Sequence, residues 1–279
     1  MGKKLVWSGA VALSLIVAVI LTVGLAGQQG AQAAGKQELQ VFAASVMTEA
    51  FEALAQEFER THPQVDVKTN FAATSVLRFQ VEQGAMPEVF ESADLKNITA
   101  LQQGGYIVGK IEPIAHNRLT VIVPASNPAG IRSLADLARP NLTLVACAQE
   151  VPVGAYTLQV LDKLQASGKF GKDYRRRVTA NFRSLEPNVK GIVTKVVLGD
   201  ADAGICYASD VNPEVAKRVK VIPIPEKYNV LATHYIGVVK GCRNPALGRE
   251  FIKLVLSPMG QHILKCKGLV PVKPICAGK

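Results

Sequence analysis

The sequence has few charged residues, few aromatic residues and only one segment apolar enough to cross a membrane. Charged residues make up 19% of the 279 residues and aromatic residues 6%, whereas hydrophobic residues make up 48%. Disordered chains are polar and highly charged, so this composition excludes disorder. A single long apolar segment also excludes a membrane protein with several spans. The chain is long enough for one large folded domain or two ordinary ones.

The motifs of common catalytic and cofactor sites are missing. There is no Gly-rich nucleotide-binding fingerprint, no C-x-x-C pair and no G-x-S-x-G elbow. The four His residues have no zinc-like spacing to Cys. An enzyme is the rival class, with Ser45, Ser75 or Ser92 as its nucleophile, but no elbow surrounds any of them. We therefore expect a protein that is not an enzyme and has no cofactor.

The first 33 residues have the pattern of a signal peptide. Lys3 and Lys4 are followed by an uncharged apolar stretch over 5–26 and then by the small-x-small sequence of Ala31, Gln32 and Ala33. The pattern predicts export to the periplasm or to the outer face of the cytoplasmic membrane. The apolar stretch is longer than the usual 7–15 residues or so. A retained membrane anchor is therefore the alternative.

Basic residues outnumber acidic residues. The chain has 32 Lys and Arg against 22 Asp and Glu, which gives a formal net charge of +10. Cleavage would remove Lys3 and Lys4 and no acid, so the charge would fall to +8. Such an excess attracts small anions or an anionic membrane surface. We interpret the run of Arg175, Arg176 and Arg177 as a solvated helix face, and export argues against nucleic acid as a partner.

The five Cys residues do not form an obvious disulfide framework. Export permits disulfides, but an odd number leaves at least one thiol unpaired. Cys147 and Cys206 lie in apolar, strand-like runs, which predicts buried free thiols. A pair among Cys242, Cys266 and Cys276 is compatible with their crowding near the C-terminus.

Strand-like and helix-like patterns alternate along the chain. The strand patterns over 39–43, 65–71 and 88–92 are each followed by an amphipathic helix pattern. This order predicts an α/β fold with parallel strands and crossover helices. Further strands are expected over 119–124, 142–147, 203–207, 219–224 and 235–239, and further helices from 152, over 189–198, 245–256 and 258–265.

The turns between strands and helices are the candidate site. Ligands of open α/β sheets bind at the carboxyl ends of strands, and helix N-termini there favour anions. The turns carry small or hydroxyl residues, over 43–46, 72–75, 92–94, 151–154 and 187–189. Tyr207 adds a phenol at the end of a strand pattern. Each turn alone is compatible with an ordinary helix cap, and the spacing does not identify a ligand.

Several blocks of sequence resemble one family. They lie over 41–45, 83–94, 151–156 and 199–210, with Asn188-Val189 as a weaker block. In this order and spacing they resemble the molybdate-binding proteins of ABC transporters, within the type II periplasmic-binding-protein class. The resemblance covers about residues 38 to 272.

The resemblance implies a two-lobe α/β fold, in which each lobe is a mainly parallel sheet flanked by helices and strand crossings join the lobes. Lobe one would comprise 37–117 plus 234–279, and lobe two 118–233. The crossings, near Leu119–Val123 and Leu231–Ile236, would form the hinge. A monomer would close on molybdate or tungstate and deliver it to an ABC permease. The alternatives are another oxyanion, such as sulfate or phosphate, or a membrane-anchored anion sensor without a transport role.

The resemblance also implies which residues bind the oxyanion. The donors would be a hydroxyl at Ser45 or the backbone at Val46, the hydroxyls of Thr74 and Tyr207, and the backbone N–H groups of Ala93, Val153 and Val189. The molybdenum would be held through the oxygens of its anion by these same residues. Val46 departs from the family, which usually has Ser at that position.

Overall fold

The computed structural model describes Gly2 and residues 36–273. The predicted signal peptide or anchor over 1–33 and Cys276 lie outside the described residues. Among the helices that are described, none combines the length and the apolar character needed to span a membrane.

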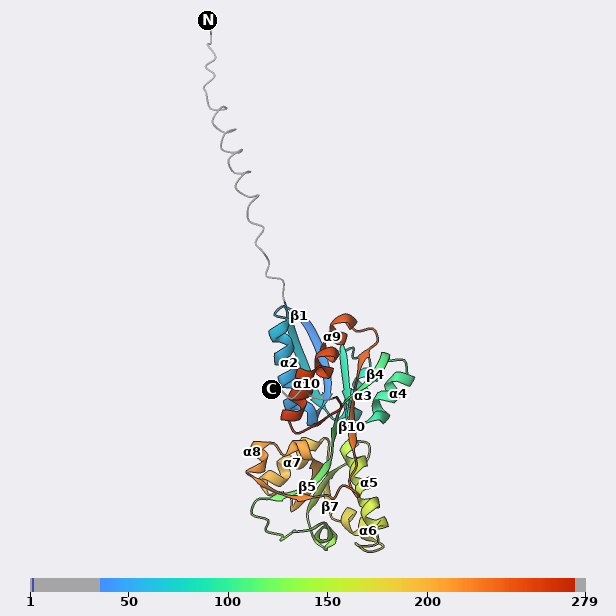
Figure 1. The fold of residues 1–279 in the computed structure, drawn as a ribbon, viewed down its shortest axis with the longest axis vertical. Helices are drawn as coiled ribbons and strands as arrows, with labels where there is room; N and C mark the ends of the chain where they lie inside the picture. Colours follow the sequence, from blue (N-terminus) through green and yellow to red (C-terminus); the bar gives the residue numbers. More distant parts are fainter. Residues whose placement is uncertain (1, 3–35, 274–279) are drawn as a thin grey trace. The chain divides into compact units, whose positions relative to one another are not determined.

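The first of two sheets has six strands in the order β11-β4-β10-β3-β1-β2. β1 is parallel to β2 and β3, whereas β10 is antiparallel to β3 and β4. We call the elements around this sheet the first lobe (Figure 1). Its strands are β1 (Gln37–Ala44), β2 (Val65–Ala72), β3 (Val89–Ser92), β4 (Ile107–Asn117), β10 (Ala232–Val239) and β11 (Val270–Pro271).

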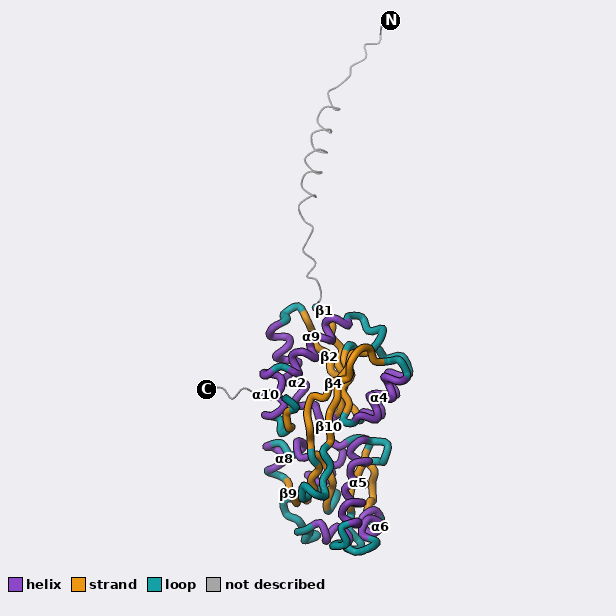
Figure 2. Tube along the Cα trace, turned by 45° about the vertical axis from the view of Figure 1, so that its right-hand side comes forward, coloured by secondary structure: helices purple, strands orange, loops and turns teal. Residues whose placement is uncertain are grey.

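Helices cover both faces of this sheet (Figure 2). On one face, Phe58 of α2 packs against Phe251 of α9 with ring centroids 5.4 Å apart. On the other face, Leu77 of α3 and Ile98 of α4 are fully buried against strand residues such as Phe90. The apolar residues that repeat at three and four along these helices therefore form the core. The helices are α2 (Thr48–Thr61), α3 (Thr74–Glu82), α4 (Leu95–Gln103), α9 (Pro245–Leu256) and α10 (Pro258–Cys266).

The second sheet has five strands in the order β7-β6-β8-β5-β9, and we call the elements around it the second lobe. Every residue of β5, β6 and β8 is buried, which explains their continuous apolar sequences. The strands are β5 (Leu119–Pro124), β6 (Leu144–Cys147), β7 (Phe182–Glu186), β8 (Ala203–Tyr207) and β9 (Val219–Pro223). The helices are α5 (Pro152–Ala166), α6 (Tyr174–Thr179), α7 (Val189–Leu198) and α8 (Pro213–Ala216), with short 3-10 turns η1 (Ser45–Met47), η2 (Leu134–Ala138) and η3 (Ala208–Asp210).

The chain passes between the sheets twice. β4 ends at Asn117 in the first sheet, and β5 begins at Leu119 in the second. The return runs from β9 to β10, over 224–231. The side chain of Asn229 bonds both the N–H and the C=O of Leu119, at 3.0 and 2.8 Å, and so ties the two crossings together. The residue boundaries of the lobes and their hinge remain a prediction.

The two-lobe α/β fold is confirmed, but the sheets are mixed rather than mainly parallel. The chain must enter and leave each lobe, so the strands beside the crossings, β10 and β5, run antiparallel to their neighbours. Three strands, β4, β7 and the two-residue β11, were not predicted. β4 contains Gly109, Lys110 and Pro113 and has register shifts against β10. β7 is an edge strand with exposed residues. The sequences of β4 and β7 therefore lack a clear apolar alternation.

Candidate functional site

A small cavity lies where turns of both lobes meet. Its volume, counted as the space open to the centre of a water molecule, is about 20 Å³. One water needs about 10–15 Å³ on this measure, so the cavity suits a ligand of very few atoms. All seven residues expected from the resemblance line it, together with six neighbours. The lining is Ala44, Ser45, Val46, Ala72, Ala73, Thr74, Ala93, Val151, Pro152, Val153, Asn188, Val189 and Tyr207.

Three helices begin at this cavity. The N-cap residues of α3 and α5 are Ala73 and Val151, and neither provides a side-chain acceptor for the N–H groups of the first turn. The N-cap of α7, Asn188, accepts only the N–H of Gly191, at 3.3 Å. Polar residues are preferred at N-caps because the first N–H groups have no partner within the helix. Apolar caps at a buried cavity leave these donors available to a ligand.

Thr74 is the buried hydroxyl of the second turn. Its side chain is 1% exposed, and its Oγ1 accepts the Ala93 N–H at 3.1 Å. A hydroxyl has one proton to donate and lone pairs to accept with. Because the bond from Ala93 uses an acceptor position, the Thr74 proton stays available for a ligand in the cavity. In this structure the Ala93 N–H is therefore directed at Thr74.

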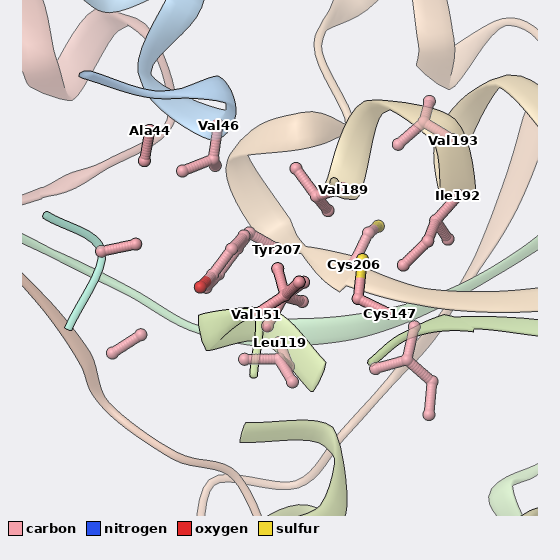
Figure 3. Close-up of a cluster of buried hydrophobic side chains, with 14 of the residues drawn as sticks. Ala44, Val46, Leu119, Cys147, Val151, Val189, Ile192, Val193, Cys206 and Tyr207 are labelled. Atoms are coloured by element: carbon pink, nitrogen blue, oxygen red, sulfur yellow. The ribbon is translucent and has the colours of Figure 1, made fainter. Parts of the chain in front are cut away.

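Tyr207 provides a phenol without a partner. It is 2% exposed, and its Oη has no hydrogen bond to any described residue. Burial raises the pKa of Tyr207 well above its usual value, so the hydroxyl keeps its proton and remains a donor. Val46 and Val189 line the same cavity, and Figure 3 shows the hydroxyl of Tyr207 pointing away from Cys147 and Cys206. Buried polar atoms usually have partners, so this one indicates a site for a ligand.

A buried hydrogen-bonded pair of a glutamate and a histidine supports the first turn, and the sequence did not predict it. Glu91 and His234 are both fully buried, with Oε1 and Nδ1 2.7 Å apart. The second oxygen of Glu91 accepts the Ala44 N–H at 2.7 Å. This bond fixes the backbone before Ser45 and Val46 and occupies the Ala44 donor. The one indication of this pair in the sequence was Glu91, an acid within the apolar pattern of β3.

No residue that lines the cavity is charged. Two cations that follow lining residues closely in sequence, Arg78 and Lys190, pair with acids. Arg78 Nε lies 3.3 Å from Glu82, and Lys190 Nζ lies 2.9 Å from Glu49. An anion in this cavity would therefore interact with dipoles rather than with a directly bound cation.

The described residues offer little support for a metal site, a disulfide or a serine nucleophile. They contain no cluster of His, Cys, Asp and Glu that could hold a metal ion. Cys147 and Cys206 are buried and free, as predicted, and burial raises the pKa of the Cys147 thiol to about 12. Cys242 and Cys266 are not bonded to each other, and Cys276 lies outside the described residues. Ser92 Oγ donates to Asp94 O at 2.6 Å within its turn.

Comparison with known proteins gives consistent results. A family model described as "Bacterial extracellular solute-binding protein" matches residues 39–270. The chain is 35% identical to the molybdate-binding protein ModA of Mycobacterium tuberculosis, over 84% of this chain and 85% of that protein.

Two solved structures share the fold. The periplasmic molybdate-binding protein of Azotobacter vinelandii matches with a TM-score of 0.73 and 22% identity, over 84% of this chain and 100% of that chain. The sulfate-binding protein SubI of M. tuberculosis matches with a TM-score of 0.75 and 17% identity, over 85% of this chain and 88% of that chain. Identities this low support the fold alone. The family match over most of the chain supports a role in binding rather than in catalysis, and the chain belongs to the bacterial extracellular solute-binding proteins.

Proposed function

We propose that the protein captures molybdate or tungstate between its lobes, outside the cytoplasm, and delivers the anion to an ABC permease. The observation that carries the proposal is the small uncharged cavity. The N-termini of α3, α5 and α7 and the unpartnered hydroxyl of Tyr207 converge there. The 35% identity to a molybdate-binding relative supports this choice of ligand.

The proposed donors suit an anion that accepts hydrogen bonds on every oxygen. The hydroxyls of Ser45, Thr74 and Tyr207 and the N–H groups of Val153 and Val189 would each donate to it. Pro152 has no N–H, so Val153 supplies the first donor of α5. The Ala93 N–H would act through Thr74, whose hydroxyl it orients. Hydrogen bonds to a charged ligand are shorter and stronger than neutral ones, so fixed dipoles replace the water shell without a counter-ion.

The same geometry suggests how other anions are rejected. Phosphate at neutral pH carries a proton, and that proton needs an acceptor inside the cavity. The lining contains no carboxylate, so only hydroxyl or carbonyl oxygens could accept that proton. A proton left without an acceptor would cost about 1–3 kcal/mol. Sulfate has no proton, so only its smaller size separates it from molybdate. Sulfate is therefore the second candidate.

Calorimetric titration with molybdate, tungstate, sulfate and phosphate tests the proposal. We expect tight binding of the first two, weak binding of sulfate and none of phosphate. Thr74→Val should weaken molybdate binding, whereas Thr179→Val, at a hydroxyl that donates to Arg176 O at the end of α6 and does not line the cavity, should not. Tight binding of sulfate alone would keep the fold and reject the ligand. Recovery of an altered anion would instead indicate an enzyme.

A further inference from the structure

An ion-pair cluster joins the two lobes beside the cavity. Lys190 Nζ lies 2.9 and 3.0 Å from the two carboxylate oxygens of Glu49, and 3.5 Å from Asp210 Oδ1. Glu49 lies on α2, which packs on β2 and α9 of the first lobe. Lys190 lies on α7, which packs on β8, β5 and β6 of the second. The pair from Glu49 to Lys190 therefore exists only when the lobes are together.

Lys190 and Glu49 each lie close in sequence to a residue that lines the cavity. Lys190 directly follows Val189, and Glu49 lies one helical turn after Val46, and both of these neighbours line the cavity. A movement that brings the N-terminus of α7 to a ligand also brings Lys190 to Glu49. Building on the proposed function, we propose that Lys190 determines oxyanion affinity without touching the anion, by latching the closed lobes through Glu49.

The charges around Lys190 explain why it, rather than Glu49, is the central residue. Asp210 is 2% exposed and belongs to the second lobe, so closure places two carboxylates on either side of one ammonium group. Burial alone raises the pKa of Glu49, but the hydrogen bond and charge of Lys190 outweigh it and hold the pKa below its usual range. Without Lys190, the carboxylates of Glu49 and Asp210 would face each other and repel, which favours opening.

Two variants distinguish a latch from a direct ligand. If Lys190 only latches the lobes, both Lys190→Met and Glu49→Gln should speed release of the anion. If Lys190 instead reached the anion, Glu49→Gln would free the cation and tighten binding. The double variant K190M/E49Q should lose less than the product of the two single losses, because both remove one interaction.

The test measures molybdate release from the protein by stopped-flow tyrosine fluorescence, with excess tungstate as competitor. Release should accelerate about tenfold in K190M and about threefold in E49Q, with little change in the association rate. Lys195→Met is the matched control, because Lys195 lies on the same helix but pairs with Glu186 within the second lobe, at 2.7 Å. K195M should release molybdate at the wild-type rate.

A second measurement separates this proposal from the proposed function. Small-angle X-ray scattering without added oxyanion should give a larger radius of gyration for K190M than for wild type and K195M. Equal radii together with equal release rates would overturn the latch, as would tighter binding by E49Q. If wild type bound no oxyanion, the proposed function would fail, while the scattering comparison would still decide whether Lys190 holds the lobes together.

Discussion

Single buried donors carry most of the chemistry of the candidate site. Tyr207 and Thr74 are almost fully buried, yet each keeps a proton that no described residue accepts. Such a donor is available to a ligand rather than to the protein, so it contributes to ligand affinity more than to the stability of the fold. Substitutions at these residues should therefore separate affinity from stability.

Tyr207→Phe should weaken molybdate binding by about ten- to a hundredfold, because one hydrogen bond to a charged ligand is worth about 1.5–3 kcal/mol. The stability of the free protein should not fall, since the lost hydroxyl has no partner. Tyr174→Phe is the control, because its buried hydroxyl donates to Leu134 O in the second lobe. That variant should lose stability and keep its affinity. Calorimetry and urea unfolding measure both quantities.

Val46→Ser tests the departure from the family pattern. Val46 is 5% exposed and lines the cavity beside Ser45. A hydroxyl there should tighten molybdate binding by about tenfold if it reaches the anion. An unchanged dissociation constant would mean that Ser45 already supplies this donor.

Asp210 should make stability depend on pH. Burial raises its pKa to about 6, against the opposing effect of Lys190. Because the folded state binds this proton more tightly than the unfolded state, the contribution of Asp210 to stability falls as pH rises from about 4 to about 6. Asp210→Asn keeps an acceptor for the Tyr207 N–H but removes the titration.

Relative to wild type, the free energy of unfolding of D210N should rise by about 2–3 kcal/mol between about pH 4 and pH 7. Denaturant unfolding at a series of pH values measures it. A constant difference between the two proteins would contradict the assignment of this titration to Asp210.

At the scale of elements, the site depends on where helices begin. The first turn of α5 packs so closely on the end of β6 that a Cβ at Gly154 would collide with Ala148 O and lie 2.6 Å from Cys147 O. This close approach brings the N–H of Val153 to the cavity. Gly260 in α10 is packed in the same way, against Leu254 O and Val255 O, but far along the chain from the candidate site.

Gly154→Ala should therefore displace the start of α5 and reduce both stability and molybdate affinity. Gly260→Ala should reduce stability by a similar amount, about 1–3 kcal/mol for overpacking, and leave affinity unchanged. Thermal unfolding and calorimetry on the two variants make the comparison. Equal affinity losses would show that the effect is general destabilisation rather than a shift of the α5 N-terminus.

At the scale of the whole molecule, the positive charge acts at long range. The net charge is +10, yet no lining residue is charged and the nearby cations Arg78 and Lys190 pair with acids. Under the proposed function, we therefore expect the excess to attract the anion towards the protein and dipoles to bind it in the cavity. Screening acts over about 8–10 Å at ordinary salt, so the two effects respond differently to ionic strength.

Raising ionic strength from about 10 to 150 mM should lower the molybdate association rate severalfold. Sucrose is uncharged and does not screen the protein's charges, so adding it should not reproduce the effect. Stopped-flow mixing measures the rate. An association rate independent of salt would show that the basic excess serves another purpose, such as contact with an anionic membrane.

Much of the site could be predicted from local sequence. The apolar periodicity of α2 and the alternation of β1 reflect which faces are buried, and the turns at Ser45 and Thr74 follow directly from where strands end and helices begin. The blocks shared with a known family then indicated which turns meet. These features are local, since they depend on residues within a few positions of each other.

Only the tertiary structure decided the contacts between distant segments. The bond from Ala93 to Thr74, the pair of Glu91 and His234 and the bridge from Lys190 to Glu49 each join residues 19 or more positions apart. The antiparallel entry of β10 likewise follows from the chain crossing twice between lobes. Local sequence therefore determined the donors that surround the cavity. Their partners depend on which helix ends and strands the fold brings together. The spacing of residues along the chain does not predict the distance between them in space.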